Sequence, residues 1–140
     1  MITLDAKHWT VEGELMVSFW VPGSIPQAVW QDFCDTLASG ATHKLLLASI
    51  GAVEFDALQR RQINEALRAR PPVAVAVVTD EAVVRGQLTA TTWLGHIDVT
   101  SFPWHKLTDA YWHLSPRDVS ERRALELVDI VRKRAEQAEQ

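Results

Sequence analysis

The chain has 140 residues, 47% of them apolar, and a net charge of −4 from 14 Lys and Arg against 18 Asp and Glu. This length suits one domain with a single core. The lone Cys34 excludes an internal disulfide and a zinc site built on paired thiolates. The acidic balance argues against nucleic acid as a partner. No apolar run is long enough for a bilayer span and the start lacks a signal-peptide pattern, which predicts a soluble, cytoplasmic protein.

The N-terminal part predicts a pair of strands. Residues 14–21 form the expected strand, with Leu15, Val17, Phe19 and Val21 on one face and Trp20 on the other. This strand is expected to pair with a segment inside 1–11 through a turn at Glu12–Gly13.

The middle of the chain alternates helices and buried strands. Ser24 is expected to cap a helix that ends at Gly40, and Lys44–Ile50 reads as a strand covered on both sides. Asp56 and Gln59 form a capping box that opens a second helix reaching about Arg68. The run VAVAVV over 73–78 predicts another buried strand.

The C-terminal part adds a strand and three helices. A helix capped by Thr79–Asp80 is expected through Leu94, followed by a strand over 97–102 and a short helix over 107–114. The Ser115–Pro116 pair predicts the start of a long final helix. Its apolar stripe needs cover, either from its own domain or from a second copy, and includes Ala124, Val128, Val131 and Ala135.

This order of elements predicts an α/β fold. We expect a mostly parallel mixed sheet of about five strands with helices on both faces, plus an extra C-terminal helix. The domain covers 1–114, and 115–140 is an amphipathic helix appended to it.

Candidate binding residues follow from this topology, because ligands of open α/β sheets collect at the carboxyl ends of strands. Six residues are expected near that edge: Ser49, Asp56, Asp80, Arg85, Trp104 and His105. Each also has a structural interpretation. The acids serve as helix caps, Arg85 neutralises nearby acids, Ser49 bonds locally and His105 is solvated.

Enzyme signatures are absent from the sequence, including nucleophile elbows, phosphate-binding loops, dinucleotide fingerprints and zinc-protease motifs. The five histidines show no short metal spacing, so neither a metal nor a cofactor is expected. A hydrolase built on Ser49, His105 and Asp80 stays open as a third interpretation, since only a structure can show its geometry. Cys34 lies on an apolar helix face and is expected to be a small buried side chain.

Six tryptophans are the compositional oddity. Trp30, Trp93 and Trp112 have ordinary packing explanations, whereas Trp9, Trp20 and Trp104 are harder to bury and are candidates for an interface. For Trp20 the alternative is cover by the C-terminal helix.

Three segments resemble the STAS fold of anti-sigma-factor antagonists, and more closely its bacterial SpoIIAA-like branch, which is grouped with SEC14-type lipid-binding domains. The segments are KLLLASIGAVEFDALQ, VAVVTDEAVVRGQLTATTWL and SFPWHKLTDAYWHL, and the resemblance covers about 4–114. Phosphorylatable STAS switches carry Ser or Thr directly after an Asp at a helix start, but here Ala57 follows Asp56.

Two functions are therefore expected. The first is a non-catalytic regulatory or scaffold domain that acts through protein contacts, including contact with a second copy. The alternative is a carrier or sensor of a small apolar or anionic ligand at the carboxyl edge of the sheet.

Overall fold

The structure is a computed structural model that describes residues 8–39, 42–51, 53–54, 56–68, 73–81 and 98–138. The predicted helix over 79–94 lies outside the described residues after Glu81. The elements follow the order β1 (Trp9–Glu12), β2 (Leu15–Trp20), β3 (Gly23–Ser24), α1 (Gln27–Ser39), β4 (Lys44–Ser49), β5 (Val53–Glu54), α2 (Ala57–Arg68), β6 (Ala74–Val78), β7 (Asp98–Phe102), the 3₁₀ turn η1 (Trp104–Lys106), α4 (Leu107–Leu114) and α5 (Glu121–Ala138).

Five strands form one sheet in the order β1-β2-β4-β6-β7. β1 runs antiparallel to β2, and the other neighbouring pairs are parallel. The predicted mixed α/β sheet is confirmed. A separate ribbon pairs β3 with β5; its strands have two residues each, too few to produce a periodic signal in the sequence.

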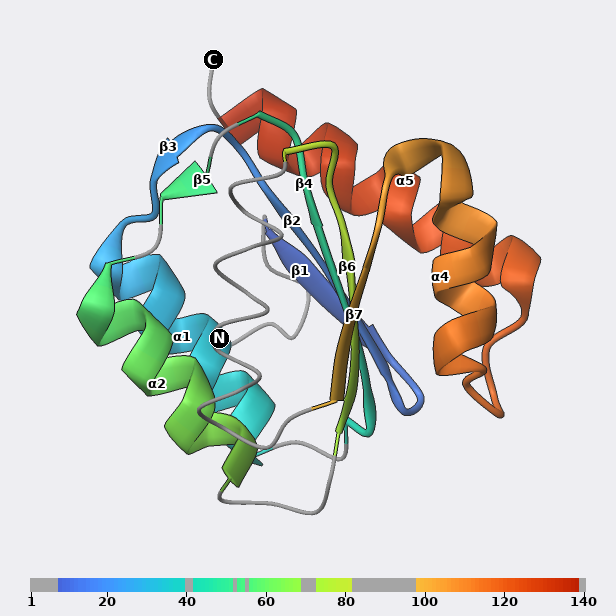
Figure 1. Ribbon diagram of the computed structural model, residues 1–140, viewed down its shortest axis with the longest axis horizontal. Helices are drawn as coiled ribbons and strands as arrows, with labels where there is room; N and C mark the ends of the chain where they lie inside the picture. The colour runs from blue at the N-terminus through green and yellow to red at the C-terminus, as the bar shows by residue number, and fades with distance from the viewer. Residues whose placement is uncertain are drawn as a thin grey trace.

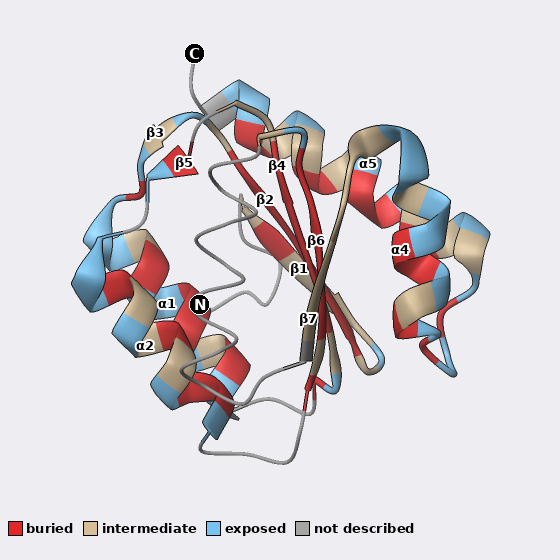
Figure 2. Cartoon of the chain, in the orientation of Figure 1, coloured by how far each residue is buried: buried red, intermediate tan, exposed pale blue. Residues whose placement is uncertain are grey.

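Helices cover both faces of the sheet: α1 and α2 lie on one side, and α4 and α5 lie on the other (Figure 1). Alternation along β2 separates the two cores, because Met16 and Trp20 point toward α1 whereas Val17 and Phe19 point toward α5. With both faces covered, β2, β4 and β6 are almost wholly buried (Figure 2).

The parallel strands follow one another across the sheet without a reversal of direction from β2 to β7. In doubly wound sheets the ligand crevice forms where the strand order reverses. The described sheet has no such point, so a hollow at its carboxyl edge must come from the connections that leave the strands.

The capping box of α2 is confirmed. The Asp56 carboxylate accepts the Gln59 backbone N–H at 2.7 Å, and the Gln59 side-chain oxygen accepts the Asp56 N–H at 3.1 Å. The expected Ser24 cap is wrong. Ser24 belongs to β3 and donates its hydroxyl to Glu54 of β5 at 3.0 Å, so α1 begins later, at Gln27.

The predicted start of the last helix is also wrong. Ser115 ends α4 in the left-handed conformation with φ 44°, and α5 begins only at Glu121. Its cap is Ser120, whose hydroxyl oxygen accepts the Arg123 N–H at 3.1 Å. The intervening loop is held by the Tyr111 hydroxyl, which donates to the Val119 carbonyl oxygen at 2.7 Å.

α5 folds back on its own domain, which decides between the two predicted kinds of cover. All four residues of the predicted stripe are buried in the core shared with β2 and β4. Arg123 adds an ion pair with Glu12 of β1 at 2.9 Å. Within the described ranges, no helix combines the length and apolarity needed to cross a membrane.

Candidate functional site

The carboxyl ends of β4, β6 and β7 bring three of the predicted residues into direct contact. The Trp104 indole N–H donates to the carbonyl oxygen of Ser49 at 2.7 Å, and the Trp104 backbone N–H donates to Asp80 at 3.0 Å. The prediction that Ser49, Asp80 and Trp104 share this edge is therefore correct.

Trp104 closes the edge on the side of α5. Its ring lies 6.1 Å from the Phe19 ring, and the Arg132 guanidinium lies 5.4 Å from its centroid. A guanidinium at this distance is attracted to the face of an indole. The side chain is only partly exposed, because strand, turn and helix all pack on it.

The three groups of the alternative hydrolase are not assembled. The Ser49 hydroxyl is buried with no hydrogen-bond partner among the described residues, and the Asp80 carboxylate accepts the Trp104 N–H. His105 is exposed on η1, and among the described residues no hydrogen bond links it to Ser49 or Asp80. A nucleophile needs a base within hydrogen-bond reach, and this arrangement supplies none for Ser49.

The remaining edge residues stand apart from this contact. Asp56 is exposed, and its carboxylate caps α2 as described above. Arg85 lies outside the described residues.

The expectation that Trp9 and Trp20 lie at an interface is wrong, because they are 2% and 3% exposed. Both belong to an aromatic cluster, in which the Trp20 ring lies 5.4 Å from Trp30 and 5.2 Å from Phe33. α1 covers this face of the sheet, so the alternative cover by the C-terminal helix is wrong as well. The Trp20 indole N–H is satisfied by the Ser18 hydroxyl at 3.2 Å.

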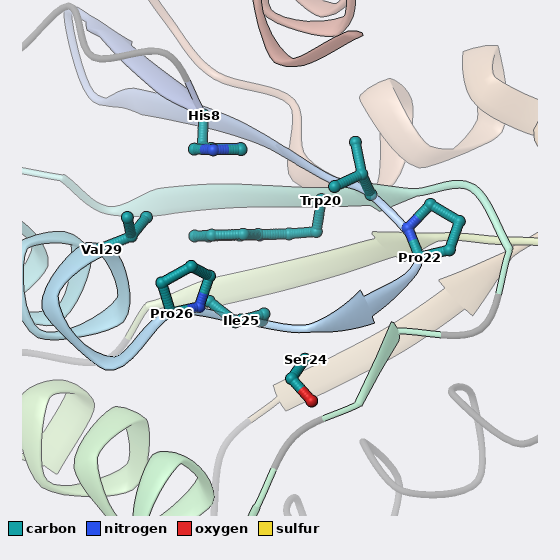
Figure 3. Close-up of a pocket in the computed structure, with 8 residues that line it drawn as sticks. His8, Trp20, Pro22, Ser24, Ile25, Pro26 and Val29 are labelled. Atoms are coloured by element: carbon teal, nitrogen blue, oxygen red, sulfur yellow. The ribbon is translucent and has the colours of Figure 1, made fainter. Parts of the chain in front are cut away.

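A cleft of about 210 Å³ opens where β2 leaves the sheet. The Trp20 indole lies in the middle of its lining, with His8 on one side of the ring plane and Ile25 and Pro26 on the other (Figure 3). The His8 ring is nearly parallel to the indole, with 5.4 Å between centroids. The described residues that line the cleft are His8, Trp20, Val21, Pro22, Ser24, Ile25, Pro26 and Val29.

Two polar side chains belong to the described lining, His8 and Ser24, and both are oriented by neighbours. His8 Nδ1 lies 3.3 Å from the Phe19 carbonyl oxygen. A carbonyl only accepts, so Nδ1 carries the proton in that bond and Nε2 of the neutral ring is an acceptor. The Ser24 hydroxyl donates to Glu54 of β5 and points away from Trp20 (Figure 3).

Gly51 fixes the position of one cleft wall. It adopts φ +70°, and a Cβ on it would lie 2.6 Å from Cγ of Pro22. Only glycine allows both this backbone conformation and this close approach. Of the described cleft residues, Trp20 was the one that the sequence proposed as a binding candidate, because the segment after β2 carries no periodic pattern.

Trp112 was expected to pack at a helix end, but it is 59% exposed. Its indole N–H donates to Glu121 at 2.9 Å, and its ring packs edge-to-face against Tyr111 at 5.0 Å. The helical spacing of the apolar residues in α4 could have predicted this exposure. Ala110, Tyr111 and Leu114 form the buried face of α4, which places Trp112 opposite them.

Cys34 is buried as expected, and burial raises the pKa of its thiol to about 12, with a further contribution from the negative charge of Asp35. A thiol with this pKa stays protonated near neutrality and is a poor nucleophile. The described residues include no cluster of His, Cys, Asp and Glu that could hold a metal ion.

Comparisons with family models, curated proteins and solved structures found no match. The resemblance to STAS domains therefore stays a prediction.

Proposed function

We propose that this chain is a non-catalytic regulatory or scaffold domain of the STAS type, located in the cytoplasm, that acts through protein contacts. Ala57 leaves no hydroxyl for a phosphate at the start of α2. A regulatory role of this kind then depends on contact surfaces instead of a phosphorylation switch.

The observation that carries the proposal is the exposed Trp112 indole. Trp is the side chain most enriched among residues that dominate binding energy at protein interfaces. Contacts with Tyr111 and Glu121 hold this indole in one orientation, so a partner need not immobilise it. Full burial of a large side chain contributes roughly 1.5–3 kcal/mol.

The surroundings of Trp112 indicate what it would bind. His105, Thr108, Asp109 and Trp112 follow the i, i+3, i+4, i+7 spacing of one helical face, and all four are exposed. Asp109 lies one turn before Trp112. The Glu121 carboxylate accepts the hydrogen bond from the Trp112 indole N–H. A basic side chain of a partner would form both a cation–π contact with the Trp112 indole and a charge-assisted hydrogen bond with a nearby carboxylate.

The test compares Trp112→Ala with Leu58→Ala in the full-length chain. Leu58 is a matched control because it is also a large, exposed apolar side chain, at 47%. Cross-linking in cells identifies partners, and sedimentation velocity measures self-association. We expect Trp112→Ala to lose a partner or a dimer that Leu58→Ala retains, with melting temperatures within a few degrees of the parent. Equal yields of every complex from both variants would overturn the proposal.

The cleft beside Trp20 supports a second candidate function, a carrier or sensor of a small ligand. A concave site with mostly apolar walls and a few oriented polar groups is the usual form of such a site. Saturable binding of any small molecule that is abolished by filling the cleft would support this candidate.

A further inference from the structure

The cleft lining carries enough chemistry to define the ligand more narrowly. We infer that it accepts a small, neutral aromatic molecule of one or two rings that bears one hydrogen-bond donor, such as a phenol or an indole. This inference rests on the second candidate function above.

The size of the cleft limits the ligand to one or two rings. A dry engineered cavity of about 150 Å³ binds benzene. A cleft of about 210 Å³ therefore holds a ring with one substituent or a fused pair of rings. It is too small for a lipid tail with a head group or for a nucleotide.

The charges around the cleft disfavour an anion. Among the described residues of the lining there is no Asp, Glu, Lys or Arg. The Glu54 carboxylate, which accepts the Ser24 hydroxyl at 3.0 Å, places negative charge next to the lining. An anionic ligand would lose its hydration there, and the described lining residues include no lysine or arginine to pair with it. This narrows the predicted apolar or anionic ligand to a neutral one.

The polar chemistry of the lining favours a ligand that carries a hydrogen-bond donor. His8 Nε2 is an acceptor once the hydrogen bond from Nδ1 to the Phe19 carbonyl oxygen is made. Pro22 and Pro26 contribute no backbone N–H to the lining. A ligand hydroxyl or ring N–H therefore finds an acceptor in His8 Nε2.

The walls favour an aromatic ring over a flexible chain. The stacked His8 and Trp20 rings and the rings of Pro22 and Pro26 form stiff, flat surfaces (Figure 3). Contacts between aromatic rings are more favourable than burial of the same area alone. Because proline fixes its own backbone angle, these walls keep their shape before a ligand arrives.

The experiment titrates the ¹⁵N-labelled full chain with phenol, indole, toluene and benzoate, and follows the amide and indole signals by NMR. We expect phenol and indole to shift the signals of His8, Trp20 and Val29 saturably. Toluene matches phenol in shape but lacks its donor, and benzoate adds a negative charge. Both should bind at least tenfold more weakly than phenol.

Two variants locate the binding. Val29→Phe places a ring inside the cleft and should abolish the shifts caused by phenol. Ala28→Phe places the same ring on the adjacent, exposed position of α1, outside the lining, and should leave them unchanged.

Three results would overturn the inference. Benzoate binding as tightly as phenol, in a manner sensitive to Val29→Phe, would reject the neutral class but keep the cleft as a ligand site. Toluene binding as tightly as phenol would reject the need for a donor. If none of the four probes shifts the cleft signals, the inference and the second candidate function both fail, while the protein-contact proposal is unaffected.

Discussion

The sheet is closed differently on its two faces at the same end. On the face of α5, Trp104 folds over the edge and packs against Phe19, and the Arg132 guanidinium lies over both rings. On the face of α1, the chain after Trp20 leaves a cleft. After β7, the turn η1 places the Trp104 ring on the edge of the sheet. After β2, the segment between Pro22 and Pro26 runs away from that edge. Closure of a strand end thus depends on the connection that follows it.

The two cores also differ in composition. The α1 side contains a cluster of large rings formed by Trp9, Trp20, Trp30 and Phe33, whereas the α5 side includes five buried alanines. Small side chains let a helix approach a sheet closely, and rings fill a wider space. Loss of one ring should therefore leave a large cavity on the α1 side.

The largest expected effect comes from Trp20→Ala. Trp20 is 3% exposed, and truncating a buried aromatic side chain costs about 3–5 kcal/mol in the free energy of unfolding. Urea denaturation measures this loss. Trp112→Ala, on the exposed face of α4, should change stability by less than about 1 kcal/mol. Similar losses for the two variants would contradict the assignment of Trp20 to the core.

Gly51→Ala should give the next largest effect and should act on the cleft. A left-handed backbone costs an alanine about 1–2 kcal/mol, and the new Cβ would also press on Pro22. Gly13→Ala is the control, since its φ of +58° is similar but its Cβ would meet the movable, exposed side chain of Asp118.

We expect Gly51→Ala to unfold at a lower urea concentration than Gly13→Ala. Only Gly51→Ala should weaken the binding of phenol. If Gly13→Ala weakens it equally, the contact between Gly51 and Pro22 does not set the cleft wall.

Trp104→Phe should have a smaller effect on the closed face. It keeps a ring beside Phe19 but removes the hydrogen bond to the Ser49 carbonyl, and such a bond contributes about 0.5–1.5 kcal/mol. Trp112→Phe removes an exposed indole hydrogen bond and should stay within about 0.5 kcal/mol of the parent. Equal urea midpoints for the two variants would show that Trp104 is not a structural closure.

The fold could be predicted from the sequence where periodicity or capping chemistry acts locally. The buried runs of β4 and β6 and the capping box at Asp56 belong to this group. The start of α5 could not, because Ser115–Pro116 resembles a helix start whose competing role, ending α4, depends on loop contacts. The pairing of β3 with β5 is likewise set by residues 30 positions apart.

The candidate site was only partly predictable. Topology correctly placed Ser49, Asp80 and Trp104 at one edge. Alternation also placed Trp20 opposite Phe19, but it could not show that α1 covers that face. The cleft depends on His8 and on the path of the chain after β2, and neither has a sequence pattern.

The smallest expected effect at neutral pH concerns Cys34, which reports on the packing of α1 against the aromatic cluster. Burial raises the pKa of the native thiol from 9.0 to about 12. Between these values the unfolded chain loses a proton that the native chain keeps, so stability falls as pH rises from about 9 toward 12. Below pH 9 both states are protonated and the contribution is constant.

Cys34→Ala isolates this effect, because the other groups that titrate in alkali are common to both proteins and cancel. We expect the urea midpoint of the parent to fall relative to that of Cys34→Ala between pH 8 and pH 10, roughly in step with proton linkage. A constant difference between the two midpoints would mean that the thiol ionises as readily in the native protein as in the unfolded chain. In that case α1 does not exclude water from the aromatic side of the sheet. The difference between the closed α5 face and the open α1 face would then hold along the whole sheet, and not only at the strand ends.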